Sequence, residues 1–418
     1  MNRPRFAPMS LAVLAVAMVG CGRCDGEAAS SSGTAPSASA AVPVTPAKVP
    51  PPSPWSFAGV RGPPGIAAPE HCRTRAPILR ANVAVTTHFA ADARSLGVLA
   101  VAETQLDPPS VLRSGVLSIG PDGKSRAGDW LPWPSAAAAP RLARAGDRWA
   151  LAWDAPHGGG VSEVVLFRGA AAESIGTGDA FVAADLACGA SRCALLTSRA
   201  ARVAPAGADV VVFEPGAGAP PRTISIDPGE GASNARPFGL AAVEGARGPV
   251  AVLTDGAEAV FWSTEGEGAP AAFARVPSEH GVLEATLLGD RPVVMAHANV
   301  VDEQGCAREG SDAAGAKIRF SRPGEPPSEV RSPGAPALAA LRPLASGALA
   351  VWLSPLGCGA SRRVVYGVVL DATGKPAAAP LPIGDGDTFV LAASGSDVDL
   401  WIRRAEEISW VRLACAPP

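Results

Sequence analysis

The sequence has 418 residues, with 46 glycines, 42 prolines and a formal net charge of −3. At roughly 150 residues per domain this length suggests two or three domains, although large all-β folds exceed that size as one unit. Hydrophobic residues make up 47% of the chain, enough for a sizeable core, whereas charged residues make up only 18%. The low, balanced charge excludes the basic surface that nucleic-acid binding requires.

The first twenty residues have the pattern of an export signal. Two arginines precede an apolar run over residues 11–19, which is too short to span a bilayer because spanning takes about 20 apolar residues. The run ends in Met18-Val19-Gly20-Cys21. This motif resembles the lipobox of bacterial lipoproteins, although methionine stands where leucine is commoner. The resemblance implies that the signal 1–20 is removed and that Cys21 carries acyl chains such as palmitate; an ordinary signal peptide cut near a cysteine is the alternative.

The stretch after Cys21 lacks aromatic residues and periodic apolar positions, and proline becomes dense toward its end. Such a stretch cannot bury enough apolar surface to offset its ordering entropy, so we expect a disordered tether. Its serine- and alanine-rich half should be flexible, and residues 43–54 should be stiffer, with polyproline II character. We therefore expect a signal peptide over 1–20, a lipidated tether over 21–54 and a folded domain over 55–418.

An internal repeat runs through the folded part. Short apolar segments recur with a mean spacing of 50 residues, and turn residues such as glycine, aspartate and serine separate each from a preceding apolar run. Apolar runs joined in this way are typical of β-hairpins. The segments begin at Val98, Trp149, Cys193, Val250, Val293, Leu349 and Val398.

Each repeat therefore predicts three to four short antiparallel strands, and no stretch shows a 3.6-residue pattern of helical length. Units of this size and strand content resemble the blades of a β-propeller, over roughly residues 73–415. The resemblance implies an all-β fold, a β-propeller with seven blades. An array of separate β-sandwiches, or six blades with an irregular cap, are the alternatives.

Eight cysteines in an exported chain favour disulfides. Cys21 is assigned to lipid, and Cys24 is left without a clear role. The other six allow fifteen connectivities. They are Cys72, Cys188, Cys193, Cys306, Cys358 and Cys415.

The repeat selects two local pairings among these cysteines. Cys188 and Cys193 flank one predicted hairpin turn, so they face each other across it. Cys306 and Cys358 occupy equivalent positions in adjacent repeats, which a ring places side by side.

The third pairing joins the two ends of the repeat region. Cys72 opens it and Cys415 nearly closes the chain, so a ring brings them together. Closing so long a loop should remove about 5 kcal/mol of unfolded-state entropy. A set of buried free thiols is the alternative for all six residues.

A search for catalytic motifs finds no H-E-x-x-H and no G-x-S-x-G. Residues 21–24 have the C-x-x-C spacing of a redox pair, but Cys21 is assigned to lipid. Residues 120–125 end like a P-loop but lie in a predicted hairpin turn. A sialidase-like propeller would need S-x-D-x-G-x-T-W boxes and a tyrosine nucleophile; the boxes are absent and the single tyrosine, Tyr366, lies in a predicted strand. We predict no catalytic residue and no cofactor.

Candidate ligand-binding residues are scattered. The acidic turns 384–387 and 302–312 lack the alternating register of a calcium loop, so we predict solvated turns and no metal site. Trp130 and Trp133 are candidates for a recognition patch, but packing on an outer strand is favoured. None of the histidines pair at ligand spacing. His297 ends a core strand and is a candidate to face a central channel, but a hydrogen-bonded histidine at a strand end is favoured. The five are His71, His88, His157, His280 and His297.

Together these observations predict a monomeric lipoprotein of the bacterial cell envelope, anchored by lipid to the outer membrane or cell surface. Its propeller is expected to bind a protein or polysaccharide partner without catalysing a reaction. One alternative is a propeller hydrolase or lyase acting on an envelope or extracellular polymer; two close acidic residues at one mouth of an axial channel would favour it. A second alternative is a purely structural envelope component.

Overall fold

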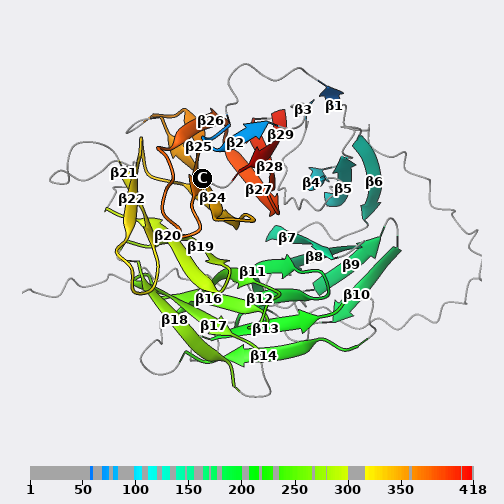
Figure 1. Ribbon diagram of the computed structural model, residues 1–418. Helices are drawn as coiled ribbons and strands as arrows, with labels where there is room; N and C mark the ends of the chain where they lie inside the picture. The colour runs from blue at the N-terminus through cyan, green and yellow to red at the C-terminus, as the bar shows by residue number, and fades with distance from the viewer. Residues whose placement is uncertain are drawn as a thin grey trace, which may run out of the picture. The chain divides into compact units, whose positions relative to one another are not determined.

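The chain folds into antiparallel β-sheets, which are labelled in Figure 1. The described residues belong to the unit formed by residues 51–418, and none of them forms a helix that is long and apolar enough to cross a membrane. The computed structural model describes residues 57–59, 68–74, 79–82, 98–105, 112–119, 125–131, 138–145, 148–154, 163–168, 171–176, 181–199, 207–215, 219–228, 235–265, 269–278, 280–299, 316–356, 360–405 and 407–416.

Five sheets share one plan, in which four consecutive strands lie side by side and antiparallel. The first contains β7 (Ala138–Ala145), β8 (Arg148–Asp154), β9 (Glu163–Arg168) and β10 (Ala171–Gly176). The second contains β11 (Phe181–Cys188), β12 (Cys193–Arg199), β13 (Ala208–Phe213) and β14 (Arg222–Ile226). The third contains β15 (Arg236–Ala242), β16 (Val250–Thr254), β17 (Glu258–Ser263) and β18 (Ala271–Pro277). The fourth contains β19 (Val282–Leu288), β20 (Arg291–His297), β21 (Ala316–Ser321) and β22 (Ser328–Ser332), and the fifth β23 (Leu338–Pro343), β24 (Ala348–Pro355), β25 (Arg363–Leu370) and β26 (Leu381–Asp385).

Two further sheets complete the described part of the chain. One has three strands in chain order, β4 (Val98–Gln105), β5 (Leu112–Ile119) and β6 (Ser125–Leu131). The other is built from both ends of the domain. Its members are β1 (Phe57–Gly59), β2 (Cys72–Thr74), β3 (Leu79–Asn82), β27 (Thr388–Ser394), β28 (Asp397–Arg404) and β29 (Glu407–Cys415).

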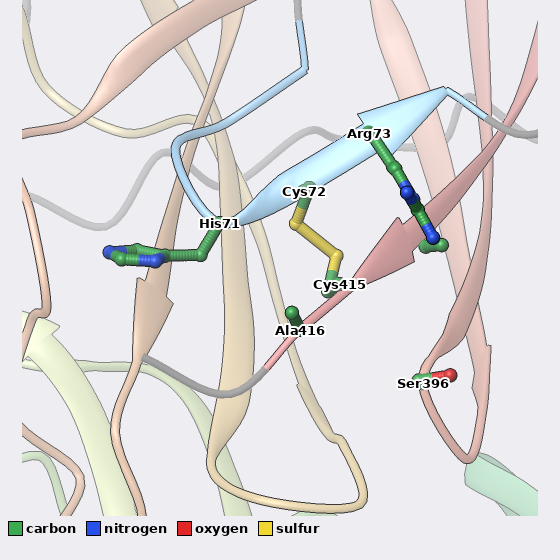
Figure 2. A pocket seen from close by; sticks show the side chains of 7 residues that line it. His71, Cys72, Arg73, Ser396, Cys415 and Ala416 are labelled. Atoms are coloured by element: carbon green, nitrogen blue, oxygen red, sulfur yellow. A yellow bond between two sulfur atoms is a disulfide. The ribbon is translucent and has the colours of Figure 1, made fainter.

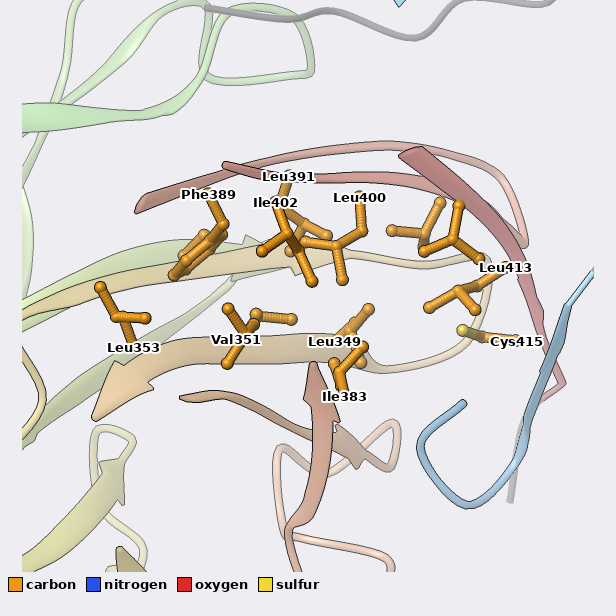
Figure 3. Close-up of a cluster of buried hydrophobic side chains, with 14 of the residues drawn as sticks. Leu349, Val351, Leu353, Ile383, Phe389, Leu391, Leu400, Ile402, Leu413 and Cys415 are labelled. Carbon is orange, nitrogen blue, oxygen red and sulfur yellow. The ribbon is translucent and has the colours of Figure 1, made fainter. Parts of the chain in front are cut away.

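The second strand of a sheet is buried on both faces, which explains the near-continuous apolar runs that mark the repeat. In β24 the side chains alternate between two cores, because successive residues of a strand point to opposite faces. Leu349, Val351 and Leu353 pack toward β27 and β28, as Figure 3 shows, whereas Ala350 and Trp352 pack toward the fourth sheet. One strand thereby serves two sheet-to-sheet interfaces.

The first strands of successive sheets contact one another in the order β7, β11, β15, β19, β23 and β27. A separate cluster of buried apolar side chains fills each of the five interfaces between these six sheets. Successive four-stranded sheets packed face to face through their innermost strands are the architecture of a β-propeller. The predicted all-β propeller fold is therefore confirmed, and the seven-blade count stays a prediction.

The last sheet closes the fold by joining both ends of the domain. β29 pairs with β28 on one side and with both β2 and β3 on the other, and β1 pairs with the far edge of β3. This sheet departs from the predicted three to four strands, because short N-terminal strands add to three C-terminal ones. Pairing between the two ends holds the closing sheet together.

The repeat positions predicted from sequence match the observed strands. The seven apolar segments lie in β4, β8, β12, β16, β20, β24 and β28. Residues 120–125, which end like a P-loop, connect the antiparallel partners β5 and β6, so the hairpin interpretation is confirmed. The predicted signal peptide, lipidated Cys21 and tether lie outside the described residues.

Candidate functional site

Charged side chains occupy the innermost strands of four sheets, where the surrounding sequence is mostly apolar. Arg141 lies on β7, Asp185 on β11, Glu284 on β19 and Arg342 on β23. The innermost strands of a propeller surround its central channel. We call these four residues the inner-strand charge cluster, and it is the candidate functional site of the described chain.

Three of the four residues follow an irregularity in their strand. The pairing register shifts just before Arg141, just before Asp185 and just before Glu284. A β-bulge adds an unpaired residue and re-aims the side chain beside it. At these irregularities the side chains of Arg141, Asp185 and Glu284 depart from the regular alternation between the two faces of the sheet.

Asp185 links its own strand to the next one. Arg141 Nε donates to the carbonyl oxygen of Ala184 at 3.1 Å, which joins β7 to β11. Asp185 Oδ1 accepts from the amide of Leu186 at 2.9 Å, and Oδ2 accepts from the amide of Leu240 on β15 at 2.8 Å. Adjacent innermost strands are thus connected by side-chain to backbone hydrogen bonds.

Gly239 on β15 lies beside this contact. A Cβ atom built at Gly239 would lie 3.4 Å from Asp185 Oδ2, an ordinary van der Waals distance that leaves little spare room. The carboxylate of Asp185 therefore packs directly against the backbone of the neighbouring sheet.

Glu284 connects β19 to β23 in the same way. Its Oε1 accepts from the amide of Ala285 at 3.0 Å, and Arg342 Nη1 donates to Oε2 at 3.3 Å. The Glu284 side chain is 20% exposed. Burial raises the pKa of Glu284, the Arg342 guanidinium opposes this effect, and the nearby Asp185 charge adds to it. Glu284 is thus a carboxyl group that resists ionisation.

A second feature is a hollow of about 550 Å³ where the two ends of the domain meet. Figure 2 shows the Cys72–Cys415 disulfide at its centre, with His71, just before β2, and Arg73, on β2, extending in different directions. Its polar lining consists of one imidazole, one guanidinium and one hydroxyl, with no carboxylate. Ligand sites of this volume are common, but they present polar groups that converge on one point. The hollow lacks that convergence. Its lining is His71, Cys72, Arg73, Ser396, Ala414, Cys415 and Ala416.

Two of the predicted cysteine pairings are confirmed. Cys72 is bonded to Cys415 and Cys188 to Cys193. The Cys188–Cys193 pair closes the β11–β12 hairpin, where the two residues lie directly opposite each other. The predicted pair Cys306–Cys358 lies outside the described residues, as does Cys24.

The acidic turn 384–387, predicted from sequence to be a solvated turn and not a calcium loop, is engaged by protein groups. Asp385 binds Arg362 through both oxygens, with an additional contact to Arg404, and Asp387 Oδ2 accepts from the amide of Ala405 at 2.7 Å. Across the described ranges no three histidine, cysteine, aspartate or glutamate side chains gather closely enough to hold a metal ion. The second acidic turn, 302–312, lies outside those ranges.

His297 is placed differently from the channel-facing position considered from sequence. It ends β20, the second strand of its sheet, and so does not lie on an innermost strand. Burial lowers the pKa of His297, with a further contribution from the charge of His280. His71 lines the hollow, whereas His88 and His157 lie outside the described residues.

The structure describes only one of the aromatic side chains considered from sequence. Tyr366 lies in β25, 7% exposed, with its ring stacked on Trp352 at 6.1 Å between centroids. Tyr366 is thus part of a buried cluster of apolar side chains. The side chain of Trp130, on β6, and the whole of Trp133 lie outside the described part.

Sequence reasoning did not find the inner-strand charge cluster, although a signal was present. Asp185 interrupts the apolar run FVAADLAC, and Glu284 interrupts VLEATLL. Each of these carboxylates lies in the strand that precedes the hairpin turn of its repeat. That strand is recognised as the innermost one only when the order of strands in the sheet is known, and this order is a tertiary property that the local sequence pattern does not contain.

The comparisons with known proteins return only distant likenesses in fold. No family model matches the chain, and no curated protein matches it in sequence. The acylaminoacyl peptidase of Pyrococcus horikoshii aligns with a TM-score of 0.45 and 9% identity over 78% of this chain and 52% of that one. Puromycin hydrolase aligns with a TM-score of 0.48 and 14% identity over 76% of this chain and 50% of that one.

A third solved structure is a domain rather than a whole enzyme. The β-propeller domain of the Trilobed protease from Pyrococcus furiosus aligns with a TM-score of 0.46 and 10% identity, over 78% of this chain and 94% of that one. The chain spans about half the length of the peptidase and the hydrolase. At these identities and TM-scores the likenesses carry no inference about activity or substrate.

Proposed function

We propose that this protein is an exported lipoprotein of the bacterial cell envelope whose propeller binds a protein or polysaccharide partner without catalysis. In this proposal residues 1–20 are removed, Cys21 carries the acyl chains, and residues 21–54 tether the domain 55–418 to the outer membrane or cell surface. The lipobox pattern supports the anchor, because two or three acyl chains hold a protein on a membrane far more firmly than one.

The observation that favours binding over catalysis is that donors of this chain already engage the central carboxylates. Both oxygens of Asp185 and both oxygens of Glu284 accept hydrogen bonds from this chain. A general acid or base must instead place its oxygen within reach of a substrate proton. The inner-strand charge cluster therefore serves to join neighbouring sheets, which leaves the loops of the propeller for recognition.

A propeller hydrolase or lyase is the second candidate, favoured by one specific feature of the same cluster. Asp185 and Glu284 interact electrostatically, and the raised pKa of Glu284 is a property of general acids. Its test is turnover of envelope or extracellular polymers by the wild type and by the Asp185→Asn and Glu284→Gln variants. Polymer cleavage that both substitutions abolish would establish this candidate in place of the binding scaffold.

The anchor is tested by fractionating a bacterium that expresses the wild-type chain, Cys21→Ala or Cys24→Ala. We expect the wild type and Cys24→Ala in the membrane fraction and Cys21→Ala outside it, because only Cys21 stands at the lipobox position. Metabolic labelling with a palmitate analogue should mark the same two chains. Membrane retention of Cys21→Ala together with loss of Cys24→Ala would overturn the assignment.

Binding is tested by cross-linking in intact cells and recovery of the chain from envelope fractions. A scaffold should recover one partner or polymer reproducibly from the wild type, and less from Cys21→Ala, which no longer meets the envelope surface. Recovery of nothing from either chain would favour the purely structural alternative.

A further inference from the structure

The order of the N-terminal strands along the chain differs from their order in the closing sheet. Along the chain, β1 comes first, then Cys72 at the start of β2, and then β3. In the sheet, β3 pairs with β29, and β1 lies outside β3. The Cys72–Cys415 bond therefore stands between β1 and β3 on the covalent path from the N-terminus.

This order decides which contacts feel tension applied to the N-terminal side of the domain. Tension first reaches β1, which is held by three residue pairs to the edge of β3. It next reaches Cys72, where the disulfide passes it directly to Cys415 on β29. β3 follows Cys72 in the chain, so its four pairs with β29 lie beyond the point at which tension leaves the N-terminal segment.

The receiving strand is the best supported member of the closing sheet. β29 pairs with β28 over eight residue pairs, and Val411, Leu413 and Cys415 belong to the buried cluster between the last two sheets. The carboxylate of Asp399 on β28 holds two β29 side chains, Trp410 and Arg412. Tension delivered to β29 is therefore opposed at once by its pairs with β28, its buried side chains and the Asp399 hydrogen bonds. Without the disulfide, β2 and β3 would separate from β29 one residue pair at a time.

The surroundings of the disulfide reinforce this arrangement. The amide of Ala416 donates to the carbonyl oxygen of His71, and that of Cys415 donates to the carbonyl oxygen of Ser396, each at 2.8 Å. Cys415 is only 2% exposed, which limits the access of reducing thiols to its sulfur. Backbone hydrogen bonds therefore hold the chain beside both cysteines, and burial shields the sulfur of Cys415.

We propose that the Cys72–Cys415 disulfide is a tension clamp: once a pull on the tether has separated β1 from β3, the disulfide stops that pull from passing along the chain to β3 and so keeps the rest of the closing sheet intact. The physiological source of the tension rests on the proposed lipid anchor, since a membrane-held tether is pulled whenever a partner holds the propeller. The mechanical property itself depends only on the chain order and the bond.

The test is a tweezers measurement on the full-length mature chain. One handle is attached at the N-terminus, and the other to a ligation tag inserted in the exposed turn Gly289–Asp290, between β19 and β20 on another sheet. In the oxidised protein we expect the first extension step to end at Cys72. Reducing the bond under tension should lengthen that step by at least the ten residues from Arg73 to Asn82, about 35 Å, and lower the force at which the rest unfolds.

The control is the double variant Cys188→Ser/Cys193→Ser, which removes a disulfide of another sheet and should keep the short first step. Cys72→Ser/Cys415→Ser should show the long step without reductant. Because reduction is also performed on single folded wild-type molecules, a folding defect in that variant leaves the measurement decisive. An unchanged step length and unfolding force after reduction would overturn the clamp.

The clamp and the anchor fail separately. If Cys21→Ala stays on the membrane while the oxidised and reduced chains differ as expected under tension, the anchor is wrong and the clamp stands. If fractionation supports the anchor but the tweezers show no difference, the clamp is wrong and the anchor stands.

Discussion

Asp399 shows how a buried charge in this fold is held. It is 2% exposed and accepts hydrogen bonds at 2.9 Å from Trp410 Nε1 and from Arg412 Nε and Nη2. Asp399→Ala leaves the partly buried guanidinium and the indole N–H without their acceptor. We expect it to lower the free energy of unfolding by about 3–5 kcal/mol, the usual cost of removing one partner of a buried ion pair, measured by urea unfolding under non-reducing conditions.

The matched control removes both charges. Asp399→Leu combined with Arg412→Met should lose clearly less than Asp399→Ala alone, because replacing a whole buried pair by apolar groups avoids an unpaired charge. A double variant as unstable as the single one would show that packing, rather than the ion pair, dominates at this site.

Glu284 predicts a pH dependence of opposite sign to the common acid-denaturation case. Its pKa is raised above the ordinary value of 4.5, chiefly by burial, so the folded state holds the proton more tightly than the unfolded state. The contribution of Glu284 to stability is therefore complete below pH 4.5 and is lost as pH rises through the raised folded pKa. Relative to Glu284→Gln, the wild type should lose stability across this interval.

The measurement is the difference in urea midpoints between the two proteins from about pH 4 to about pH 8. Arg342→Gln provides an internal check, because Arg342 opposes the raised pKa of Glu284. Its removal should make the loss larger and extend it to higher pH. A smaller loss in Arg342→Gln would contradict the placement of these charges.

At the scale of elements, the hairpin turns decide where the strands end. Gly347, in the β23–β24 turn, has φ +93°, and a Cβ atom there would lie 2.0 Å from the carbonyl oxygen of Leu370. Gly289, in the β19–β20 turn, also has positive φ but has no atom within 4 Å of a built Cβ. These two glycines separate the cost of the left-handed backbone from the cost of a collision.

We predict that Gly289→Ala costs about 1 kcal/mol, the penalty of the left-handed conformation alone. Gly347→Ala should cost more, about 3 kcal/mol or above, because the backbone of β25 must also move. Thermal unfolding of both variants measures the difference. Equal losses would mean that the β23–β24 hairpin shifts freely against β25.

The same elements show what the sequence could and could not predict. The turn residues and apolar runs predicted the hairpins and the second strand of each four-stranded sheet, because both are local signals. The pairing of Cys72 with Cys415 was also predictable, since any closed ring of repeats joins its ends. The contact of Asp185 with Leu240 and the pairing of β1 with β3 were not, because they depend on bulges and on long-range order, which leave no periodic pattern.

At the scale of the whole molecule, stability is assembled from interfaces between neighbouring sheets. Each of the six consecutive sheets shares a buried apolar cluster only with its neighbours, so no single core spans the described structure. An open end of such an array would expose the face of a terminal sheet, so joining the two ends of the domain should add to its stability. The closing sheet supplies that connection through β2, β3 and the Cys72–Cys415 bond.

The two disulfides should therefore differ sharply in their effect on global stability. The Cys72–Cys415 bond spans 343 residues of sequence and the Cys188–Cys193 bond only 5. Because the entropy removed from the unfolded chain grows with loop length, Cys72→Ser/Cys415→Ser should lose about 5 kcal/mol and Cys188→Ser/Cys193→Ser about 2 kcal/mol. Denaturant unfolding of both variants gives the comparison. If the short hairpin bond proved the more costly to remove, local strain relief around β11 and β12 would outweigh chain entropy, and closure of the ring would rest on strand pairing rather than on the covalent bond.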